Sequence, residues 1–172
     1  MNLFIPKMYV KDIFSINYNK LKNNGYKIII FDLDNTIGNI KENIFDKKTS
    51  DFLNKLNKEF KIIIASNSSK KRVLTFCQNI ECGKYYFSLK PLSLVLYKIK
   101  KKNNINYDKM VIVGDQLLTD IVLGNRKGLC TILVDKKNKK DLIITKFNRI
   151  IENIIKKKYN IKKGAYYSWK NV

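Results

Sequence analysis

The feature that most constrains the fold is an apolar run that leads directly into two carboxylates. Residues 28–31 read Ile-Ile-Ile-Phe, and Asp32, Leu33 and Asp34 follow. An apolar run of this kind is typical of a strand that is buried on both faces of a parallel sheet. Because residues i and i+2 of a strand point the same way, we expect Asp32 and Asp34 to reach one crevice beyond its carboxyl end.

Similar apolar runs recur along the chain and alternate with segments of helical spacing. We expect strands at residues 26–32, 61–65, 85–87, 110–113 and 129–134. This alternation predicts an α/β fold, a Rossmann-like three-layer sandwich with a mainly parallel central sheet. We expect residues 1–160 to form one domain, followed by a basic and aromatic tail over residues 161–172.

The helices are predicted from apolar spacing and start signals. A short helix is expected within Tyr9–Leu21, Thr49 is expected to cap the helix after the first strand, and Lys90–Pro91 is expected to open a later helix. The residues expected to face the sheet from the helices after the second and third strands are Val73, Leu74, Cys77, Ile80, Leu94, Val95 and Ile99.

Composition excludes several classes of chemistry. The chain has no histidine, which excludes His-based catalysis and zinc sites with His ligands. Its three cysteines form no C-x-x-C pair, which favours free thiols in a reducing cytoplasm. No apolar stretch is long enough for a membrane span and no signal peptide is recognisable, so the sequence predicts a cytoplasmic protein.

The strongly basic charge has two explanations. Lys and Arg number 35 against 14 Asp and Glu, a net charge of +21. Such a surface attracts nucleic acid, anionic lipid or phosphorylated substrates. A general preference for Lys and Asn would give the same composition, so the charge alone does not identify a partner.

Polar residues at other strand ends and helix starts suit one phosphate and one metal ion. Ser66 and Asn67 follow the second strand and can bind phosphoryl oxygens, while Lys90 can supply positive charge. Asp115 ends the fourth strand and Asp120 follows one turn later. Hard oxygen ligands without histidine suit Mg²⁺, beside which one Asp can attack phosphorus and another can transfer a proton. Taken singly, each group is also consistent with ordinary capping.

As an ordered set, these motifs resemble the haloacid dehalogenase (HAD) phosphatases, and most closely the YqeG family of HAD subfamily IIIA. The resemblance covers roughly residues 5–155. It rests on residues 32–36 (Asp-Leu-Asp-Asn-Thr), Ser66-Asn67, Lys90-Pro91 and residues 114–120, and continues through residues 124–128, 131–134 and 144–149. Beyond about residue 160 the likeness fades.

The resemblance implies a role for each motif residue. Asp32 would be the phosphorylated nucleophile, Asp34 the general acid and base, and Lys90 the group that orients and neutralises. Mg²⁺ would be bound by Asp32, Asp115 and the backbone carbonyl of Asp34, and Asp120 would support Lys90 or the metal. The implied phosphate-binding residues are Ser66, Asn67, Thr36 and Lys90.

The resemblance also suggests a substrate. Neither interval between the motifs has room for the cap domain that selects substrates in many HAD enzymes, so the site is expected to be open. Relatives in mitochondria and plastids are phosphatidylglycerophosphate phosphatases. This implies dephosphorylation of phosphatidylglycerophosphate, an anionic lipid, on the inner membrane face. The alternatives are a soluble or macromolecular phosphate, or a basic module that binds RNA or ribosomes.

The C-terminal segment leaves two interpretations open. Residues 150–158 form a basic amphipathic segment, and aromatic residues follow at 166, 167 and 169. Such a segment suits an anchor at a lipid surface. Alternatively, Ile150, Ile151, Ile154 and Ile155 pack on the sheet as an ordinary core helix.

Overall fold

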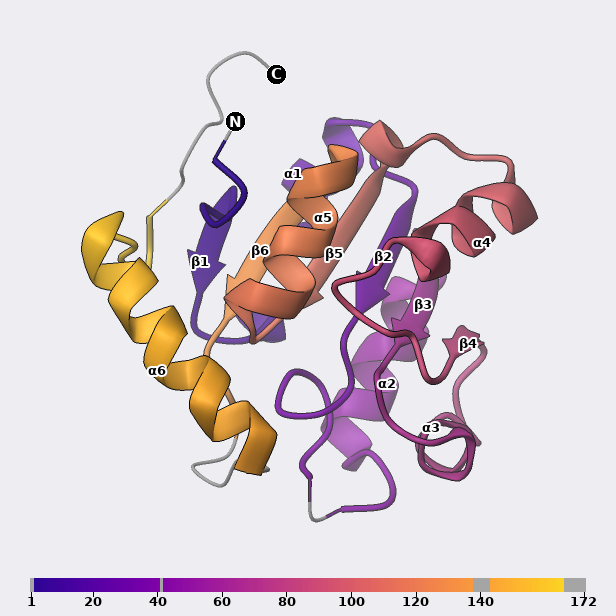
Figure 1. Cartoon of the computed structure of the whole chain (residues 1–172). Helices are drawn as coiled ribbons and strands as arrows, with labels where there is room; N and C mark the ends of the chain where they lie inside the picture. Colours follow the sequence, from indigo (N-terminus) through magenta and orange to yellow (C-terminus); the bar gives the residue numbers. More distant parts are fainter. Residues whose placement is uncertain (1, 41, 138–142, 166–172) are drawn as a thin grey trace.

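The chain folds into a three-layer α/β sandwich around one parallel sheet (Figure 1). The computed structural model of the chain describes residues 2–40, 42–137 and 143–165, and the side chains of the last range from residue 148 onward. Within these ranges six strands lie in the order β1-β6-β5-β2-β3-β4, and all neighbouring strands run parallel. They are β1 (Met8–Val10), β2 (Ile28–Phe31), β3 (Lys61–Ala65), β4 (Gly83–Tyr85), β5 (Met110–Gly114) and β6 (Cys130–Val134).

Helices cover both faces of the sheet, as Figure 1 shows. One face packs against α1 (Tyr18–Asn23), α2 (Lys47–Leu56) and α3 (Lys70–Phe76). The other packs against α4 (Leu94–Asn103) and α5 (Val122–Lys127). The last helix, α6 (Ile143–Lys158), contributes to a smaller cluster with β1 and β6. Single turns occur at η1 (Ile13–Ser15), η2 (Tyr107–Lys109) and η3 (Leu117–Ile121), the last with π-helical hydrogen bonding.

Strand β2 is the centre of the sheet because its side chains are apolar on both faces. Ile29 and Phe31 belong to the core cluster on one face, while Ile28 and Ile30 belong to the cluster on the other. This is the alternation of a strand buried on both sides. The N–H of Asp32 still donates to the Val113 carbonyl at 2.9 Å, so the first carboxylate lies directly at the end of the paired strand.

The prediction of one helix within Tyr9–Leu21 is wrong for its first part. Tyr9 and Val10 belong to β1, whose register pairs them with Leu133 and Val134 of β6. The helix α1 begins only at Tyr18. A three-residue strand is too short to show a period in the sequence, and it is stabilised by pairing with a segment more than 120 residues away. The sheet therefore has one strand more than the five that we expected.

Two helix starts also differ from the prediction. The cap of α2 is Asp46, whose side chain accepts from the Thr49 N–H at 2.7 Å, so Thr49 lies in the first turn. The Lys90–Pro91 peptide bond is cis, and α4 begins at Leu94 rather than at Pro91. Leu94, the first residue of α4, is exposed, whereas Leu96 is buried together with the predicted Val95 and Ile99.

Two further details of the α3–β4 region correct the sequence analysis. Leu74 is exposed, whereas Phe76 is buried and completes the inner face of α3 with Val73. The strand expected at residues 85–87 is observed at Gly83–Tyr85 as β4, so residues 86 and 87 lie outside it. Cys77 and Ile80 are buried as predicted. These differences from the prediction are small, because the strands that lead into the motifs lie where the sequence predicts them.

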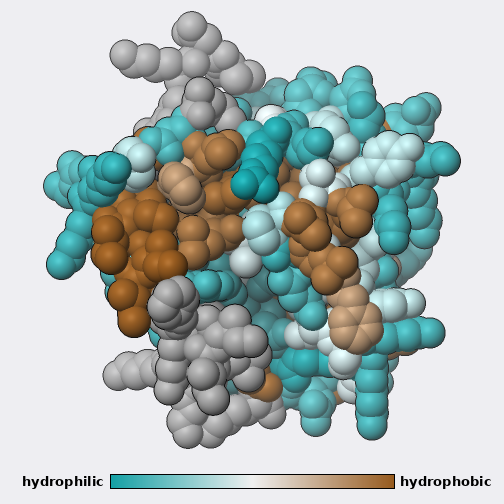
Figure 2. Space-filling model, viewed as in Figure 1, coloured by the Kyte–Doolittle hydropathy of each residue, from teal (hydrophilic) through white to brown (hydrophobic). Residues whose placement is uncertain are grey.

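The described segments around the motifs contain no inserted domain. Between Thr36 and β3 they form a loop and α2, and between β3 and Lys90 they form α3 and β4. Among the described helices, none has the length and apolar content of a membrane span. Figure 2 shows apolar side chains gathered on one face, one group over α6 and another over the region that leads into α4. The aromatic residues of the tail lie outside the described residues.

Candidate active site

Asp32 and Asp34 both line a cavity of about 610 Å³ at the carboxyl ends of the strands. A tight loop follows β2, in which the N–H groups of Ile37 and Gly38 both donate to the Leu33 carbonyl, at 3.2 and 2.8 Å. The cavity, called the crevice below, is lined by Asp32, Asp34, Asn35, Ile40, Ser66, Asn67, Ser68, Lys90, Pro91, Gln116, Leu118, Thr119 and Asn148. The fold therefore brings residues of all four predicted motifs to one opening.

Three buried carboxylates form a cluster next to this opening. Oxygens of Asp32, Asp115 and Asp120 lie within 4.8 Å of one another. The Thr36 hydroxyl is 3.3 Å from Asp32 Oδ2 and 3.3 Å from Asp115 Oδ1. Gly114 makes room for the cluster, because a Cβ at this position would lie 2.2 Å from the carboxyl carbon of Asp120. The glycine before Asp115 is thus required by the close approach of Asp120.

Lys90 is the cation that faces this cluster. Its Nζ donates to Asp32 Oδ1 at 2.5 Å and to Asp120 Oδ1 at 2.7 Å, and its side chain is 3% exposed. Burial alone would lower the pKa of Lys90, but the carboxylates of Asp120 and Asp32 outweigh burial and raise it above its ordinary value. Lys90 is therefore positively charged at neutral pH, within reach of Asp32.

Burial also changes the titration of the carboxylates. It raises the pKa of Asp32 to about 8, against the opposing effect of Lys90 and with a contribution from the neighbouring Asp120 and Asp115. Burial likewise raises the pKa of Asp115 to about 6, although the Arg149 guanidinium opposes it. The three aspartates cannot all be ionised without more positive charge than Lys90 and Arg149 together provide. The site favours the binding of an additional cation.

The loop after β3 connects the crevice to Lys90. The Asn67 side chain accepts from the Lys90 N–H at 2.9 Å and donates to the Lys90 carbonyl at 3.2 Å. Ser66 is buried, and its hydroxyl accepts from the Ser68 N–H at 3.1 Å. Asn67 therefore positions the backbone of Lys90, which its assignment as a phosphate-binding residue did not anticipate.

Sequence reasoning missed the residues that bind Asp34. Arg72, on α3, donates to Asp34 Oδ1 from Nε at 2.8 Å and from Nη2 at 2.6 Å. The Ser68 hydroxyl donates to Asp34 Oδ2. Arg72 also donates to the carbonyls of Asn39 and Glu42, so it joins α3 to the loop after β2. Residue type was the available signal, because Arg72 is one of only three arginines among the 35 basic residues of the chain.

Sequence reasoning also missed the contribution of α6 to the carboxylate cluster. Arg149 forms an ion pair with the Asp115 carboxylate, and its Nη1 donates to the Asp115 carbonyl at 2.6 Å and to Glu152 Oε2 at 2.9 Å. Glu152 is buried, and its Oε1 accepts from the Leu118 N–H at 3.1 Å. The residues 144–149 were noted as part of the family resemblance, which was the available signal.

Comparisons with known proteins agree with this geometry. A family model described as mitochondrial PGP phosphatase matches residues 1–76, and a model described as HAD-hydrolase-like matches residues 89–154. The chain is 34% identical over 153 residues to the probable phosphatase YqeG of Bacillus subtilis, an alignment that covers 88% of this chain and 89% of that protein. The chain belongs to the YqeG family of HAD phosphatases.

More distant relatives of this YqeG-family chain extend the comparison. It is 27% identical over 143 residues to phosphatidylglycerophosphate phosphatase 1, chloroplastic/mitochondrial, of Arabidopsis thaliana, covering 76% of this chain and 40% of that protein. Two solved structures share the fold. They are a predicted HAD-like family hydrolase from Porphyromonas gingivalis (TM-score 0.55, 11% identity, 74% of this chain and 98% of that chain) and an uncharacterized protein from Listeria monocytogenes serotype 4b (TM-score 0.50, 19% identity, 76% and 99%).

The carboxylate cluster of this YqeG-family protein fits a hard divalent cation. Its three members supply the oxygen ligands that Mg²⁺ prefers, and they carry more negative charge than Lys90 and Arg149 together offset. Asp120, expected only to support Lys90 or the metal, is itself a member of the cluster. The side chain of Asp34 lies apart from the cluster, with Ser68 and Arg72.

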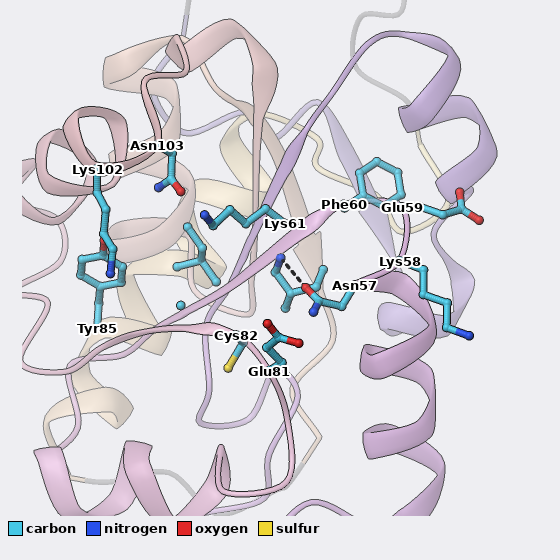
Figure 3. Close-up of a pocket in the computed structure, with 13 residues that line it drawn as sticks. Asn57, Lys58, Glu59, Phe60, Lys61, Glu81, Cys82, Tyr85, Lys102 and Asn103 are labelled. Carbon is cyan, nitrogen blue, oxygen red and sulfur yellow. Dashed lines mark hydrogen bonds between the residues drawn. The ribbon is translucent and has the colours of Figure 1, made fainter.

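A second hollow lies at the opposite end of the strands (Figure 3). It measures about 470 Å³ and is lined by residues that include Asn57, Lys61, Cys82, Tyr85 and Asn103. Lys61 and Gly83 begin their strands here, so this hollow faces the amino ends of β3 and β4. The residues of the HAD motifs do not line it. The crevice is therefore the candidate active site, since it is lined by residues of the HAD motifs.

Proposed function

We propose that this protein is a Mg²⁺-dependent phosphomonoester hydrolase that works through a phosphorylated Asp32. The observation that carries the proposal is the position of Asp32. Its buried carboxylate lines the crevice, Lys90 binds it at 2.5 Å, and Asp115 and Asp120 lie within 4.8 Å. A carboxylate held between a lysine and a cation site is suited to attack a phosphorus atom.

Asp32 forms an oxygen–phosphorus bond while the bond from phosphorus to the ester oxygen breaks. Asp34 gives a proton to the leaving oxygen and then takes one from the water that attacks the same phosphorus. This second step releases inorganic phosphate and restores the Asp32 carboxylate. Asp34 is 23% exposed at its side chain, so it can meet both the leaving group and water.

The other motif residues bind and neutralise the phosphoryl group. Ser66 and the Asn67 N–H are assigned to its oxygens together with Thr36, and Lys90 offsets the charge that develops on them. Mg²⁺, when bound by Asp32, Asp115 and the backbone carbonyl of Asp34, supplies further positive charge to the transferring group. Asp120 positions Lys90, which it binds at 2.7 Å.

The substrate that we propose is phosphatidylglycerophosphate, and the product is phosphatidylglycerol. One family model and one relative support this choice. The model is described as mitochondrial PGP phosphatase, and the relative is the Arabidopsis phosphatidylglycerophosphate phosphatase 1. The crevice is not covered by an inserted domain within the described residues, which suits a phosphate presented on a large surface. Action on such a lipid places the protein in the cytoplasm, peripherally on the inner membrane face.

The net charge of +21 favours a second candidate, a soluble or macromolecular phosphate hydrolysed by the same residues. A module that only binds RNA or ribosomes is less well supported. Binding a polyanion does not require three buried carboxylates, which repel it.

The experiment that tests this proposal measures phosphate release from phosphatidylglycerophosphate in mixed micelles, with Mg²⁺ and with EDTA. The Asp32→Asn variant and a soluble aryl phosphate are the controls. Mg²⁺-dependent release from the lipid that is lost in the variant is the expected result. Turnover of the aryl phosphate but not of the lipid would support the assignment as a phosphatase and reject phosphatidylglycerophosphate as the substrate. No turnover of either compound would reject the hydrolase.

A further inference from the structure

Two groups of exposed apolar side chains border the crevice. Leu89, Leu92 and Leu94 lie on one side, next in the chain to the crevice residue Pro91. Ile150 and Ile154 lie on α6, which contributes the crevice residue Asn148. Each of these five side chains is between 53% and 62% exposed. We call them the apolar rim. Figure 2 shows both groups on one face, with a mainly hydrophilic strip between them.

Along the outer face of α6, apolar residues come first and basic residues follow. Ile150 and Ile154 are exposed from the middle of the helix onward, one turn apart, and Lys157 and Lys158 are exposed on the same face one turn after Ile154. The opposite face carries the buried Glu152, and Ile155 packs against the cluster around Tyr9 and Leu133. The interpretation as a core helix is therefore confirmed for Ile155 and wrong for Ile150 and Ile154, which are exposed.

Helix α4 repeats this order on the other side of the crevice. Leu94 and Tyr97 are exposed in its first turns, and Lys98 and Lys101 follow on the same face. Both helices begin near the crevice, α4 after Pro91 and α6 before Asn148. The exposed surface is thus apolar close to the opening and basic further out on both sides.

The rim is held in place by contacts with the active site. Leu89 has a positive φ of 51°, a conformation that is unfavourable for residues other than glycine. The loop keeps it there, since Asn67 binds both backbone groups of Lys90 and the Leu92 N–H donates to the Leu89 carbonyl at 2.8 Å. On the other side, α6 is tied to Asp115 through Arg149.

We propose that the apolar rim and the flanking lysines dock this face on an anionic lipid bilayer, with the crevice turned toward the membrane. This inference rests on the proposed lipid phosphatase. Apolar side chains near the opening enter the acyl boundary, while the outer lysines meet anionic headgroups. Charge complementarity selects this partner over a neutral surface, and exposed Leu and Ile side chains argue against nucleic acid, which binds basic and aromatic residues.

The test is co-sedimentation of the full chain with vesicles of phosphatidylcholine alone or mixed with phosphatidylglycerol. The double variants Ile150→Ser/Ile154→Ser and Leu89→Ser/Leu92→Ser remove each side of the rim, and Lys157→Glu/Lys158→Glu reverses the outer charge. Leu74→Ser is the apolar control, since Leu74 is exposed on α3. Lys55→Glu/Lys58→Glu is the charge control, since both lysines are exposed on or beside the end of α2.

The expected result is binding to the mixed vesicles only, weakened at least tenfold by each rim or Lys157/Lys158 variant and less than twofold by the controls. Hydrolysis of an aryl phosphate should stay within twofold of the parent in every variant, which separates docking from catalysis. Failure of the parent to bind mixed vesicles would overturn the proposal, as would equal losses in the control variants. The proposal would also be overturned if the rim variants lost self-association while their vesicle binding stayed unchanged. Rim-dependent binding without phosphatase activity would retain the docking surface and reject only the hydrolase.

Discussion

Asp32 and Asp34 come from one motif, two residues apart, and their surroundings differ in almost every respect. Asp32 is 8% exposed at its side chain and faces Lys90 and two further carboxylates, on the side of β5. Asp34 is 23% exposed and is bound by Ser68 and Arg72, on the side of α3. Buried like charges beside a lysine favour cation binding and nucleophilic attack, whereas a partly exposed carboxylate can exchange protons with substrate and water.

This comparison indicates that the motif by itself does not determine which aspartate is suited to nucleophilic attack and which to proton transfer. Strand β2 ends at Phe31. The N–H of Asp32 still donates to β5, so Asp32 lies at the edge of the sheet, whereas Asp34 lies in the loop that follows. The elements that pack against each residue then decide its chemistry. Substitutions that exchange or remove these surroundings are therefore the most informative.

The largest effect on stability is expected from Lys90→Met. The change leaves Asp32 and Asp120 buried without their cation, and breaking a buried ion pair in this way costs about 3–5 kcal/mol of unfolding free energy. Urea unfolding at pH 7 measures it. The control Lys98→Met, at an exposed position of α4, should change the unfolding free energy by less than about 0.5 kcal/mol. An unfolding free energy of Lys90→Met within about 1 kcal/mol of the parent would mean that Lys90 does not compensate the cluster.

Asp34→Asn should leave the fold intact and reduce turnover by about 10²- to 10⁴-fold, the range for loss of a general acid. The loss should be greatest for an alkyl phosphate and smaller for a nitrophenyl phosphate, because a good leaving group needs less protonation. Steady-state rates with both substrates measure this difference. Glu42→Gln, in the same loop region, should stay within about twofold, as surface changes usually do. Equal losses on the two substrates would remove Asp34 from proton transfer.

The smallest effect is expected from Arg149→Gln, which changes the orientation of Asp115 without removing a carboxylate. Loss of a residue that orients a metal ligand typically weakens metal binding by about 10- to 100-fold. Calorimetric titration with Mg²⁺ measures it without any substrate, and Lys157→Gln on the exposed face of the same helix is the control. Unchanged Mg²⁺ affinity together with a lower melting temperature would show that Arg149 serves only to attach α6.

The central strands and the carboxylates were predictable because their signals are local. The apolar runs of β2, β3 and β5 each end at a polar residue of a motif, so sequence order is sufficient to place Asp32, Ser66 and Asp115 at one edge. The HAD fold follows from the same signals.

The contacts that complete the site were not predictable, since they join distant segments. Arg72 reaches Asp34 across 38 positions and Arg149 reaches Asp115 across 34, so no local pattern shows which carboxylate either side chain binds, although they are two of only three arginines among 35 basic residues. Strand β1 was missed for a related reason, because its pairing with β6 is also a long-range contact. Leu94 is exposed as the first residue of α4, a helix whose start the sequence placed three residues too early.

The measurement that tests the central claim most directly is the identification of the phosphorylated residue. The Asp34→Asn variant, in which water attack is slowed, is mixed with a nitrophenyl phosphate and Mg²⁺, quenched in acid, digested and analysed by mass spectrometry. The account predicts one phosphoryl group on Asp32, absent when Asp32→Asn is added to the same variant. A phosphoryl group on another residue, or turnover with no phosphorylated peptide, would contradict it.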